Sequence, residues 1–502
     1  MMNENETEFK DETTSREERK RQRRKGMTYQ MLMSLFANVS VLGPAMGFGY
    51  SAVVLPTLQS PDSEFKISRN QASWIASAAA IGTPLGCILC SFILRRGRKI
   101  SLLITSGFSL CGWLVIYMSS GYTQIVVGRV IGGIATGLAA VPATVYSAEI
   151  ASPKWRGVLV TWSSIAIAMG ILIVYVFGYI LQDNWRLIAL LCSIFPTAAI
   201  GLTLFVLPES PIWLKETGRV DEARVIMKKF RGISADSPAP AEVEAELQVR
   251  QHPKAKSMMK HLLRRSSLKP FAIILTYFFF QQFSGIFVIV YYAVAISEEA
   301  GVRMDAYLGA ILIGLTRLLG SFVVASVSRK LGRRWPSIIS GSGMTLFMGT
   351  LAIYLLLIDR GYEIGDRGFI PVVCILMYIF MSTVGFLVLP FAMIGEIFPA
   401  KVKDILSGVT TCIAYVFSFV TVKTYPDMLD CMGKHGVFCF YAFMSLLGTI
   451  FVTLCLPETK GKTLHEIDEL FAGKKKADKN GAQETKVDMF PLKDVSAAAV
   501  ES

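Results

Sequence analysis

The chain has 502 residues, of which 52% are hydrophobic and only 18% are charged, whereas a soluble domain carries roughly 25% charged residues. This composition excludes an ordinary water-soluble fold of this length. The formal net charge is +13, a value that fits nucleic-acid binding, an anionic partner surface or the topology signal of a membrane protein, so the positions of the charges decide between these classes.

Apolar stretches of about 20 residues follow one another along the chain, and each is long enough to cross a membrane as a helix. We identify twelve, at approximately 29–56, 72–94, 100–118, 124–147, 158–181, 187–207, 270–296, 306–328, 337–358, 369–394, 407–426 and 437–456. The longest polar connection, 208–269, divides them into six plus six.

The basic residues are distributed unequally between the two sides of these spans. Of the 51 Lys and Arg residues, 41 lie in segments that share the side of the N-terminus, and seven lie in segments on the other side. Because cytoplasmic loops are enriched in Lys and Arg, we expect both termini in the cytosol and attribute the net charge to topology rather than to nucleic acid. Three cations, Arg129, Arg317 and Lys423, fall within spans, and Lys423 is expected to extend its ammonium group to the outer interface.

A pattern of charged residues repeats at the cytosolic ends of the spans. The segment 95–99 after the second span corresponds to 330–334 after the eighth, 149–156 after the fourth corresponds to 396–403 after the tenth, and 208–210 corresponds to 457–459. Parallel repeats of this kind are typical of transporters built from two halves.

The signs of these charges suggest a gate. Pairs between carboxylates and cations can latch the two halves when the cytosolic mouth closes and break when it opens; the alternative is that the charges only set topology, since surface ion pairs contribute little. The residues assigned to this cytosolic gate are Arg95, Arg98, Arg129, Glu149, Arg156, Glu209, Arg333, Arg334, Glu396, Lys403 and Glu458.

Several motifs together resemble the sugar porters of the major facilitator superfamily, over about residues 30 to 470. They are the paired Gly-Arg loops, Gly128-Arg129, Glu149 through Gly157, Pro208-Glu209-Ser210-Pro211, Gln281-Gln282-Phe283-Ser284-Gly285 and Pro457-Glu458-Thr459. Lys423-Thr424-Tyr425-Pro426 is similar to the insect branch of facilitated trehalose transporters.

The resemblance implies an all-α integral membrane protein with twelve transmembrane helices in two six-helix bundles, the major facilitator fold. The implied parts are a cytosolic tail 1–28, a bundle 29–207, an intracellular helical linker 208–269, a second bundle 270–456 and a cytosolic tail 457–502. The implied function is facilitated transport of trehalose or a hexose across the plasma membrane by alternating access. Because the first span has no Asp or Glu between Met27 and Pro61, whereas proton-coupled relatives carry an acid there, facilitation is favoured over symport.

A sugar site needs amides and hydroxyls together with an apolar or aromatic face. Gln281 and Gln282 lie at mid-depth of the seventh span, and because neighbouring helical residues point about 100° apart, at least one should face the cavity; the alternative is that they bond neighbouring helices. Gly285 can interrupt this helix where it lines the cavity. Tyr291 and Tyr292 are expected at the outer mouth, as gates or as interface anchors.

Other candidate site residues depart from the family pattern. The family's Gln of the fifth span is Ser164 here, its Glu of the tenth span is Thr383, and the following Trp is Phe391, which either stacks on substrate or fills the core. Two family Asn positions are Phe287 and Ala414.

Arg317 replaces a third family Asn, near the centre of the eighth span. A charge there costs at least ~2.5–3.5 kcal/mol on insertion scales, and no span carries a carboxylate to pair with it. We expect Arg317 either to line the wet cavity and touch substrate or to cap carbonyls at a helix break.

Cofactors and metals are not expected. The four histidines lack ligand spacing, and Gly461-Lys462-Thr463 lacks the first Gly of a phosphate-binding loop, so neither a metal site nor ATP-driven transport is indicated. The expected partners are a small neutral sugar and the lipid bilayer. Two other functions stay open: a carrier of another small organic solute, such as an anion that Arg317 would contact, and a sugar receptor that does not transport.

Overall fold

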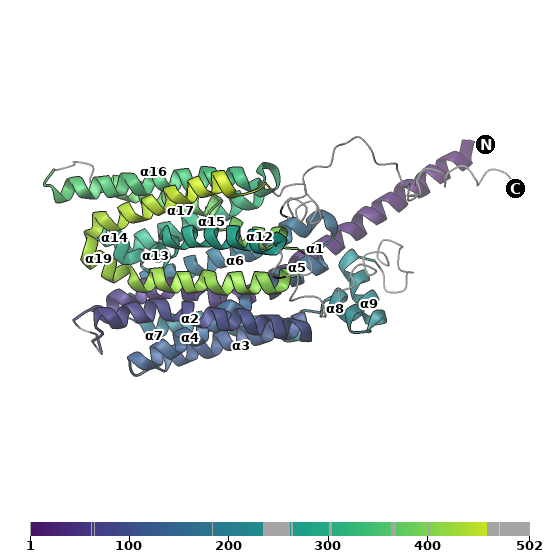
Figure 1. Cartoon of the computed structure of the whole chain (residues 1–502). Helices are drawn as coiled ribbons and strands as arrows, with labels where there is room; N and C mark the ends of the chain where they lie inside the picture. The colour runs from purple at the N-terminus through teal and green to yellow at the C-terminus, as the bar shows by residue number, and fades with distance from the viewer. Residues whose placement is uncertain are drawn as a thin grey trace, which may run out of the picture.

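The computed structural model describes residues 2–61, 63–64, 66–182, 184–233, 262, 265–300, 304–362, 368–399, 402–458 and 471. These residues form helices joined by short turns, with no strand among them. In Figure 1 the long helices lie side by side, and the short helices α8 (Pro211–Glu216) and α9 (Val220–Arg231) lie at one end of them. We call that end the linker face and the other end the opposite face.

Twelve helical crossings form two bundles, which confirms the predicted fold class. The first bundle contains α1 (Met2–Gln59), α2 (Arg69–Ile93), the 3-10 turn η1 (Leu94–Arg96), α3 (Arg98–Tyr117), α4 (Tyr122–Ala139), α5 (Pro142–Ile150), α6 (Pro153–Ile180) and α7 (Trp185–Phe205). The second contains α12 (Arg265–Phe283), α13 (Ile286–Tyr291), α14 (Ala293–Glu299), α15 (Ala306–Leu331), α16 (Arg334–Asp359), α17 (Phe369–Val384), α18 (Leu389–Ile397) and α19 (Lys403–Cys455).

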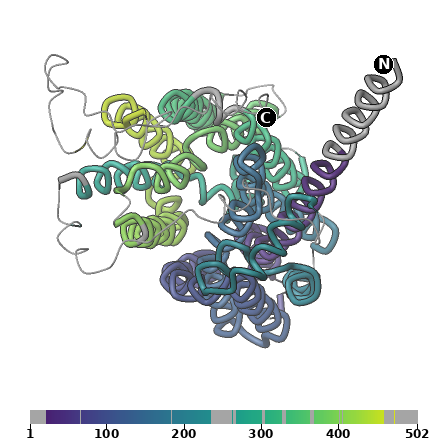
Figure 2. Tube along the Cα trace, turned by 90° about the vertical axis from the view of Figure 1, so that its right-hand side faces the viewer, coloured from purple at the N-terminus to yellow at the C-terminus, as the bar shows by residue number. Residues whose placement is uncertain are grey.

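The described helices supply 10 stretches that are long and apolar enough to cross a membrane. The stretch in α19 is long enough for two crossings, and the broken series α12 to α14 adds the twelfth. Figure 2, seen from the linker face, shows the purple-to-blue first half beside the green-to-yellow second half.

Interruptions of the crossings repeat between the halves. α4 ends before α5, and α17 ends before α18. Pro142 and Pro390 lie in the first turn of α5 and α18, where a backbone N–H has no helical partner and its absence therefore costs no hydrogen bond. The seventh crossing breaks at Gly285, whose φ is +86°. A Cβ atom at this residue would lie 2.6 Å from the ring of Tyr441, so only glycine fits this turn. The interruption expected at Gly285 is therefore found.

The ends of two crossings differ from the expectation. α1 begins at Met2, so the helix continues backward through the polar segment that precedes the first span. α19 consists of two helices that meet at a kink at Gly433, where φ is +68° and ψ is 174°, so the two expected spans are present and a kink stands where a polar loop was expected. Nearly half of the expected linker (234–261, 263–264) and most of the expected C-terminal tail (459–470, 472–502) lie outside the described residues.

Glycines bring α2 and α4 into backbone contact. A Cβ added to Gly82 or Gly86 would lie 2.2 or 2.1 Å from a carbonyl oxygen of α4, and one added to Gly133 or Gly137 would lie 2.0 or 2.1 Å from a carbonyl oxygen of α2. Small residues allow such close packing of membrane helices, where no hydrophobic driving force operates between them. Among the described glycines of the first bundle, those of α2 and α4 therefore make the closest approach to the backbone of another helix.

The two bundles meet along two symmetry-related helix pairs. α2 packs against α19 and α6 packs against α15, while α1 contacts α13 and α14. Since the second and eighth crossings correspond in the repeat, as do the fifth and eleventh, each half contributes the same two helices to the interface.

Candidate functional site

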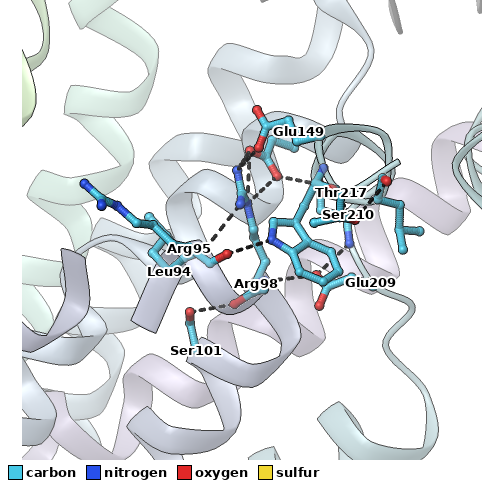
Figure 3. A network of polar contacts seen from close by, with 12 residues as sticks. Leu94, Arg95, Arg98, Ser101, Glu149, Glu209, Ser210 and Thr217 are labelled. Carbon is cyan, nitrogen blue, oxygen red and sulfur yellow. Dashed lines mark hydrogen bonds and ion pairs between the residues drawn. The ribbon is translucent and has the colours of Figure 1, made fainter. Parts of the chain in front are cut away.

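Glu149 and Glu209 gather the basic loop of the first half at the linker face (Figure 3). The Glu149 carboxylate accepts hydrogen bonds from Nη2 and Nε of Arg98 at 2.7 and 2.9 Å. The Glu209 carboxylate accepts from the backbone N–H groups of Arg98 and Lys99 at 3.0 and 3.1 Å, where the first N–H groups of α3 lack helical partners. Gly97 has a φ of +137°, and a Cβ there would lie 2.7 Å from the Glu209 carboxylate.

The second half builds the same cluster. Nη2 and Nε of Arg333 donate to Glu396 at 2.7 and 3.2 Å, and Glu458 accepts from the backbone N–H groups of Arg333 and Arg334 at 3.0 and 3.1 Å. Gly332 has a φ of +76° and also lies against its glutamate. The hydrogen bond to Glu396 raises the pKa of Arg333.

The charged pairs of these clusters lie within each half. Trp213 donates its indole N–H to the carbonyl of Arg95 at 3.1 Å, and Arg156, which is exposed, donates to the carbonyl of Ala148 at 3.1 Å. Arg334 donates to the carbonyl of Thr453, and Lys403 begins α19 half-buried. The repeat was predicted correctly, whereas the pairs across the halves that the gate hypothesis requires do not form among the described residues in this conformation.

Arg129 does not belong to the linker-face clusters, so its assignment to the cytosolic gate is wrong. It lies two turns into α4, towards the opposite face, and is 2% exposed. Its Nε, Nη1 and Nη2 atoms donate to the carbonyls of Ile75, Gly47 and Ala76 at 3.1, 2.5 and 3.4 Å. Each nitrogen of this buried guanidinium is therefore satisfied by the backbone of α1 or α2.

The polar contacts between the halves gather towards the opposite face. Lys423 of α19 donates to Oδ1 of Asn70 and to Oγ of Ser73, both at 2.6 Å, and its ammonium lies 5.1 Å from the ring centre of Trp74. It therefore binds α2 rather than snorkelling to the interface. Arg69 also pairs with Asp430 across the halves.

Contacts from α6 and α15 complete this junction. The Tyr175 hydroxyl donates to the carbonyl of Val290 at 2.7 Å, and the Tyr307 hydroxyl donates to the carbonyl of Val53 at 3.5 Å. Nearer the linker face, the thiol of Cys412 contacts the carbonyl of Pro84 at 3.5 Å.

The two glutamines of the seventh crossing play different parts. Nε2 of Gln281 donates to the carbonyls of Phe386 and Leu387, both at 2.9 Å, and so holds the interruption between α17 and α18. Gln282 donates to Gln281 at 3.3 Å, but its buried Oε1 atom has no hydrogen-bond partner within the described ranges. Gln281 therefore bonds a neighbouring crossing, as the alternative interpretation expects, whereas Gln282 has an unused acceptor and its contact with a cavity stays a prediction.

The tyrosines after the break are both buried. Tyr291 meets Phe48 of the first half edge-on, with ring centres 5.9 Å apart. Tyr292 stays within the second half, where it donates to the carbonyl of Val422 at 3.4 Å and lies 4.9 Å from the Tyr425 ring. Only Tyr291 of this pair has a described contact across the halves.

The remaining candidates take packing positions. Phe391 lies edge-on to Phe278 at 4.8 Å. Thr383 bonds the carbonyl of Ile379 in its own helix and packs against Gly320 of α15. Ser164 is half-buried on α6.

A polar network near Ser164 was missed from the sequence. Ser163 donates to Oδ1 of Asn38 at 2.8 Å and is bonded by Thr144 at 3.0 Å, while Ser34 and Ser147 share a bond of 2.7 Å. An amide inside an apolar span, Asn38, was the available signal, because polar side chains in membrane helices bond across helices.

Arg317 lies in the middle of α15, which runs unbroken through it. This removes the interpretation in which it caps carbonyls at a helix break. Its Nη1 atom is buried and has no hydrogen-bond partner among the residues described.

Comparisons with known proteins agree with this architecture. The family model described as "Sugar (and other) transporter" matches residues 7–471. A facilitated trehalose transporter of Polypedilum vanderplanki is 31% identical over 457 residues, which cover 89% of each chain, and one of Apis mellifera ligustica is 30% identical, again over 89% of each chain.

Solved structures share the fold. The inward-open conformation of the xylose transporter XylE from E. coli has a TM-score of 0.71 and 24% identity, covering 88% of this chain and 99% of that one. The partially occluded inward-open conformation has a TM-score of 0.70, covering 87% and 100%.

Proposed function

Because the chain belongs to the sugar (and other) transporter family, as its motifs predict, we propose that it carries a small sugar down its gradient by alternating access. Trehalose and hexoses are the first substrates to test, since the relatives described above are facilitated trehalose transporters. The absence of an acidic residue in the first span supports facilitation rather than proton coupling.

One observation carries this proposal. The described polar contacts between the halves gather towards one face, and Gln282, three residues before the break at Gly285, keeps a buried, unused acceptor. Buried polar groups are normally bonded, so a hydroxyl-bearing solute that supplies the missing donor explains the exception. Two bundles closed at one end and able to rock about a central site are the elements of alternating access.

The orientation is part of the same proposal. The excess of Lys and Arg on the side of the linker face supports a cytosolic location for this face and for both termini in the plasma membrane. We retain the division into tails 1–28 and 457–502, bundles 29–207 and 270–456, and linker 208–269. In this orientation the observed conformation is closed on the outer side.

We assign substrate contact first to Gln282 and Arg317. Gln281, Tyr291, Tyr292, Phe391, Ser164 and Thr383 support or line this region. Glu149 and Glu396, with the arginines that they bind, keep the helix ends in place at the cytosolic gate, where exposed Arg156 and half-buried Lys403 can reach the other half when that face closes.

Counterflow into proteoliposomes tests the function. Purified protein is reconstituted with unlabelled sugar inside, and labelled trehalose, glucose or a polyol is added outside with and without a pH gradient. We expect transient accumulation of at least one sugar, independent of the gradient, and at least a tenfold loss in Gln282→Ala. Absence of counterflow for every sugar, despite binding, would refute transport; accumulation driven by the pH gradient would refute only facilitation.

A further inference from the structure

Arg317 lies at the junction of the two halves. It is 6% exposed, and one turn before it on α15 Gly314 packs against Tyr175 and Leu172 of α6. The hydroxyl groups of Tyr175, Tyr291 and Tyr415, on three different helices, are near enough to interact with it electrostatically. The guanidinium therefore faces the region where α6, α13 and α19 meet α15.

This charge is not balanced by the described part of the chain. No Asp or Glu forms an ion pair with Arg317 there, and its buried Nη1 donor is unused. The guanidinium group keeps its proton at any physiological pH. A buried charge without a partner is costly, so this arrangement is one that a bound anion would stabilise.

Arg129 is the matched comparison within the same chain. It is also a buried arginine in a membrane crossing and also interacts electrostatically with Tyr291. However, each of its three guanidinium nitrogens donates to a backbone carbonyl. A buried arginine in this fold can therefore have all of its guanidinium nitrogens hydrogen-bonded by the protein. Arg317 differs because its Nη1 atom has no such partner among the described residues.

We propose that Arg317 makes this carrier selective for sugar acids, in which a carboxylate accompanies the hydroxyl groups. The proposal rests on the proposed function and specifies its substrate class. The planar fork of arginine matches a carboxylate in a bidentate manner, and the unused acceptor of Gln282 matches a sugar hydroxyl. One guanidinium balances one carboxylate, whereas a phosphate ester, with a charge of about −1.5 to −2 at neutral pH, leaves excess negative charge.

The test uses the full-length protein in proteoliposomes, with labelled D-glucuronate and labelled D-glucose as substrates and glucose 6-phosphate as competitor. Wild-type protein should exchange glucuronate at least tenfold more efficiently than glucose, and glucuronate should compete better than glucose 6-phosphate. Arg317→Gln should lose at least tenfold in glucuronate exchange and less than twofold in glucose exchange. Arg317→Lys keeps the positive charge but lacks the planar guanidinium group, so its glucuronate exchange should lie between those of the wild-type protein and Arg317→Gln.

The control is Arg360→Gln, which removes an exposed cation at the opposite face and should leave both exchanges unchanged. Folding of each variant is checked by size-exclusion chromatography. If Arg317→Gln does not fold, the proposal is tested by two other results: the preference of the wild-type protein for glucuronate over glucose, and reduced glucuronate exchange by Arg317→Lys.

Glucose exchange without glucuronate exchange, equal glucuronate exchange by Arg317→Gln, or stronger competition by glucose 6-phosphate would overturn the sugar-acid proposal and leave sugar transport standing. Exchange of neither substrate, together with no counterflow of trehalose, would overturn the proposed function itself.

Discussion

The two faces of the molecule use charge in different ways. At the linker face each half carries the same cluster, in which two glutamates bind one arginine side chain and the N–H groups of a helix start. At the opposite face Lys423 and Arg69 bind across the halves, and the repeat offers no equivalent of these contacts among the described residues. The repeated contacts stabilise each half, and the contacts without a counterpart hold the halves together.

The largest effect on stability is expected for Glu149→Ala. Its side chain and that of Arg98 are only 12% and 11% exposed, and loss of one partner from a buried pair costs about 3 kcal/mol. The midpoint of thermal unfolding in detergent should therefore fall markedly. Glu396→Ala is the matched variant in the second half, where the partners are 34% and 21% exposed, and it should cost less; equal costs would contradict the argument from burial. If the cluster also supports gate closure, Glu149→Ala should reduce access of an outer-side inhibitor.

The glycines of the basic loops come next. Gly97→Ala places a Cβ 2.7 Å from the Glu209 carboxylate in backbone of positive φ, which costs about 1–3 kcal/mol. Gly332→Ala should behave alike against Glu458. Gly121→Ala, where nothing lies within 4 Å of the added Cβ, serves as the control, and a comparable loss of unfolding free energy in that variant would show that the clash is not the cause.

Lys423→Ala should change the balance between conformations more than stability. It removes two hydrogen bonds from a charged donor across the halves, and a net loss of about 1.4 kcal/mol would shift the equilibrium about tenfold towards separation at the opposite face. Spin labels at Glu64 and Met432, in a background whose exposed cysteines (Cys111, Cys431, Cys439 and Cys455) are serines, should report longer distances. Lys434→Ala, an exposed cation on the same face, should leave the distances unchanged.

The smallest effect is expected for the pair of Arg69 and Asp430. Their side chains are 49% and 57% exposed, and exposed pairs are worth about 0–1 kcal/mol and are weakened by salt. Asp430→Asn should shift the same distance distribution slightly at low ionic strength and not at high ionic strength. A shift as large as that of Lys423→Ala would mean that the two contacts act as one unit.

The sequence predicted what depends on local pattern. Apolar length located the crossings, and the repeated Gly-Arg and acidic motifs placed Glu149, Glu209 and their counterparts on the same face as the basic loops, although pairs across the halves were expected and the pairs lie within each half. Gly285 was recognised as a break because glycine tolerates the backbone angles that a turn inside a helix requires.

The sequence did not predict which partners distant segments supply. Arg129 was assigned to the wrong face because the carbonyls that accept its hydrogen bonds belong to α1 and α2, at positions without any side-chain signal. Lys423 was expected to reach the interface because the polar residues Asn70 and Ser73 are about 350 positions away in the chain. For Gln281 and Gln282 the helical angle indicated that the two side chains point in different directions, but it could not show that Phe386 and Leu387 supply the carbonyls that Gln281 binds.

The close backbone contact of α2 and α4 makes these two helices move together as one rigid unit of the first half. α2 carries Asn70 and Ser73 near one face, and α4 leads through Pro142 into α5, whose last turn carries Glu149 at the other face. Backbones that touch through glycine cannot slide or bend independently without collision, so a displacement at one end is transmitted as tilt. Release of Lys423 on one side of the membrane therefore has a direct mechanical route to the charged cluster on the other.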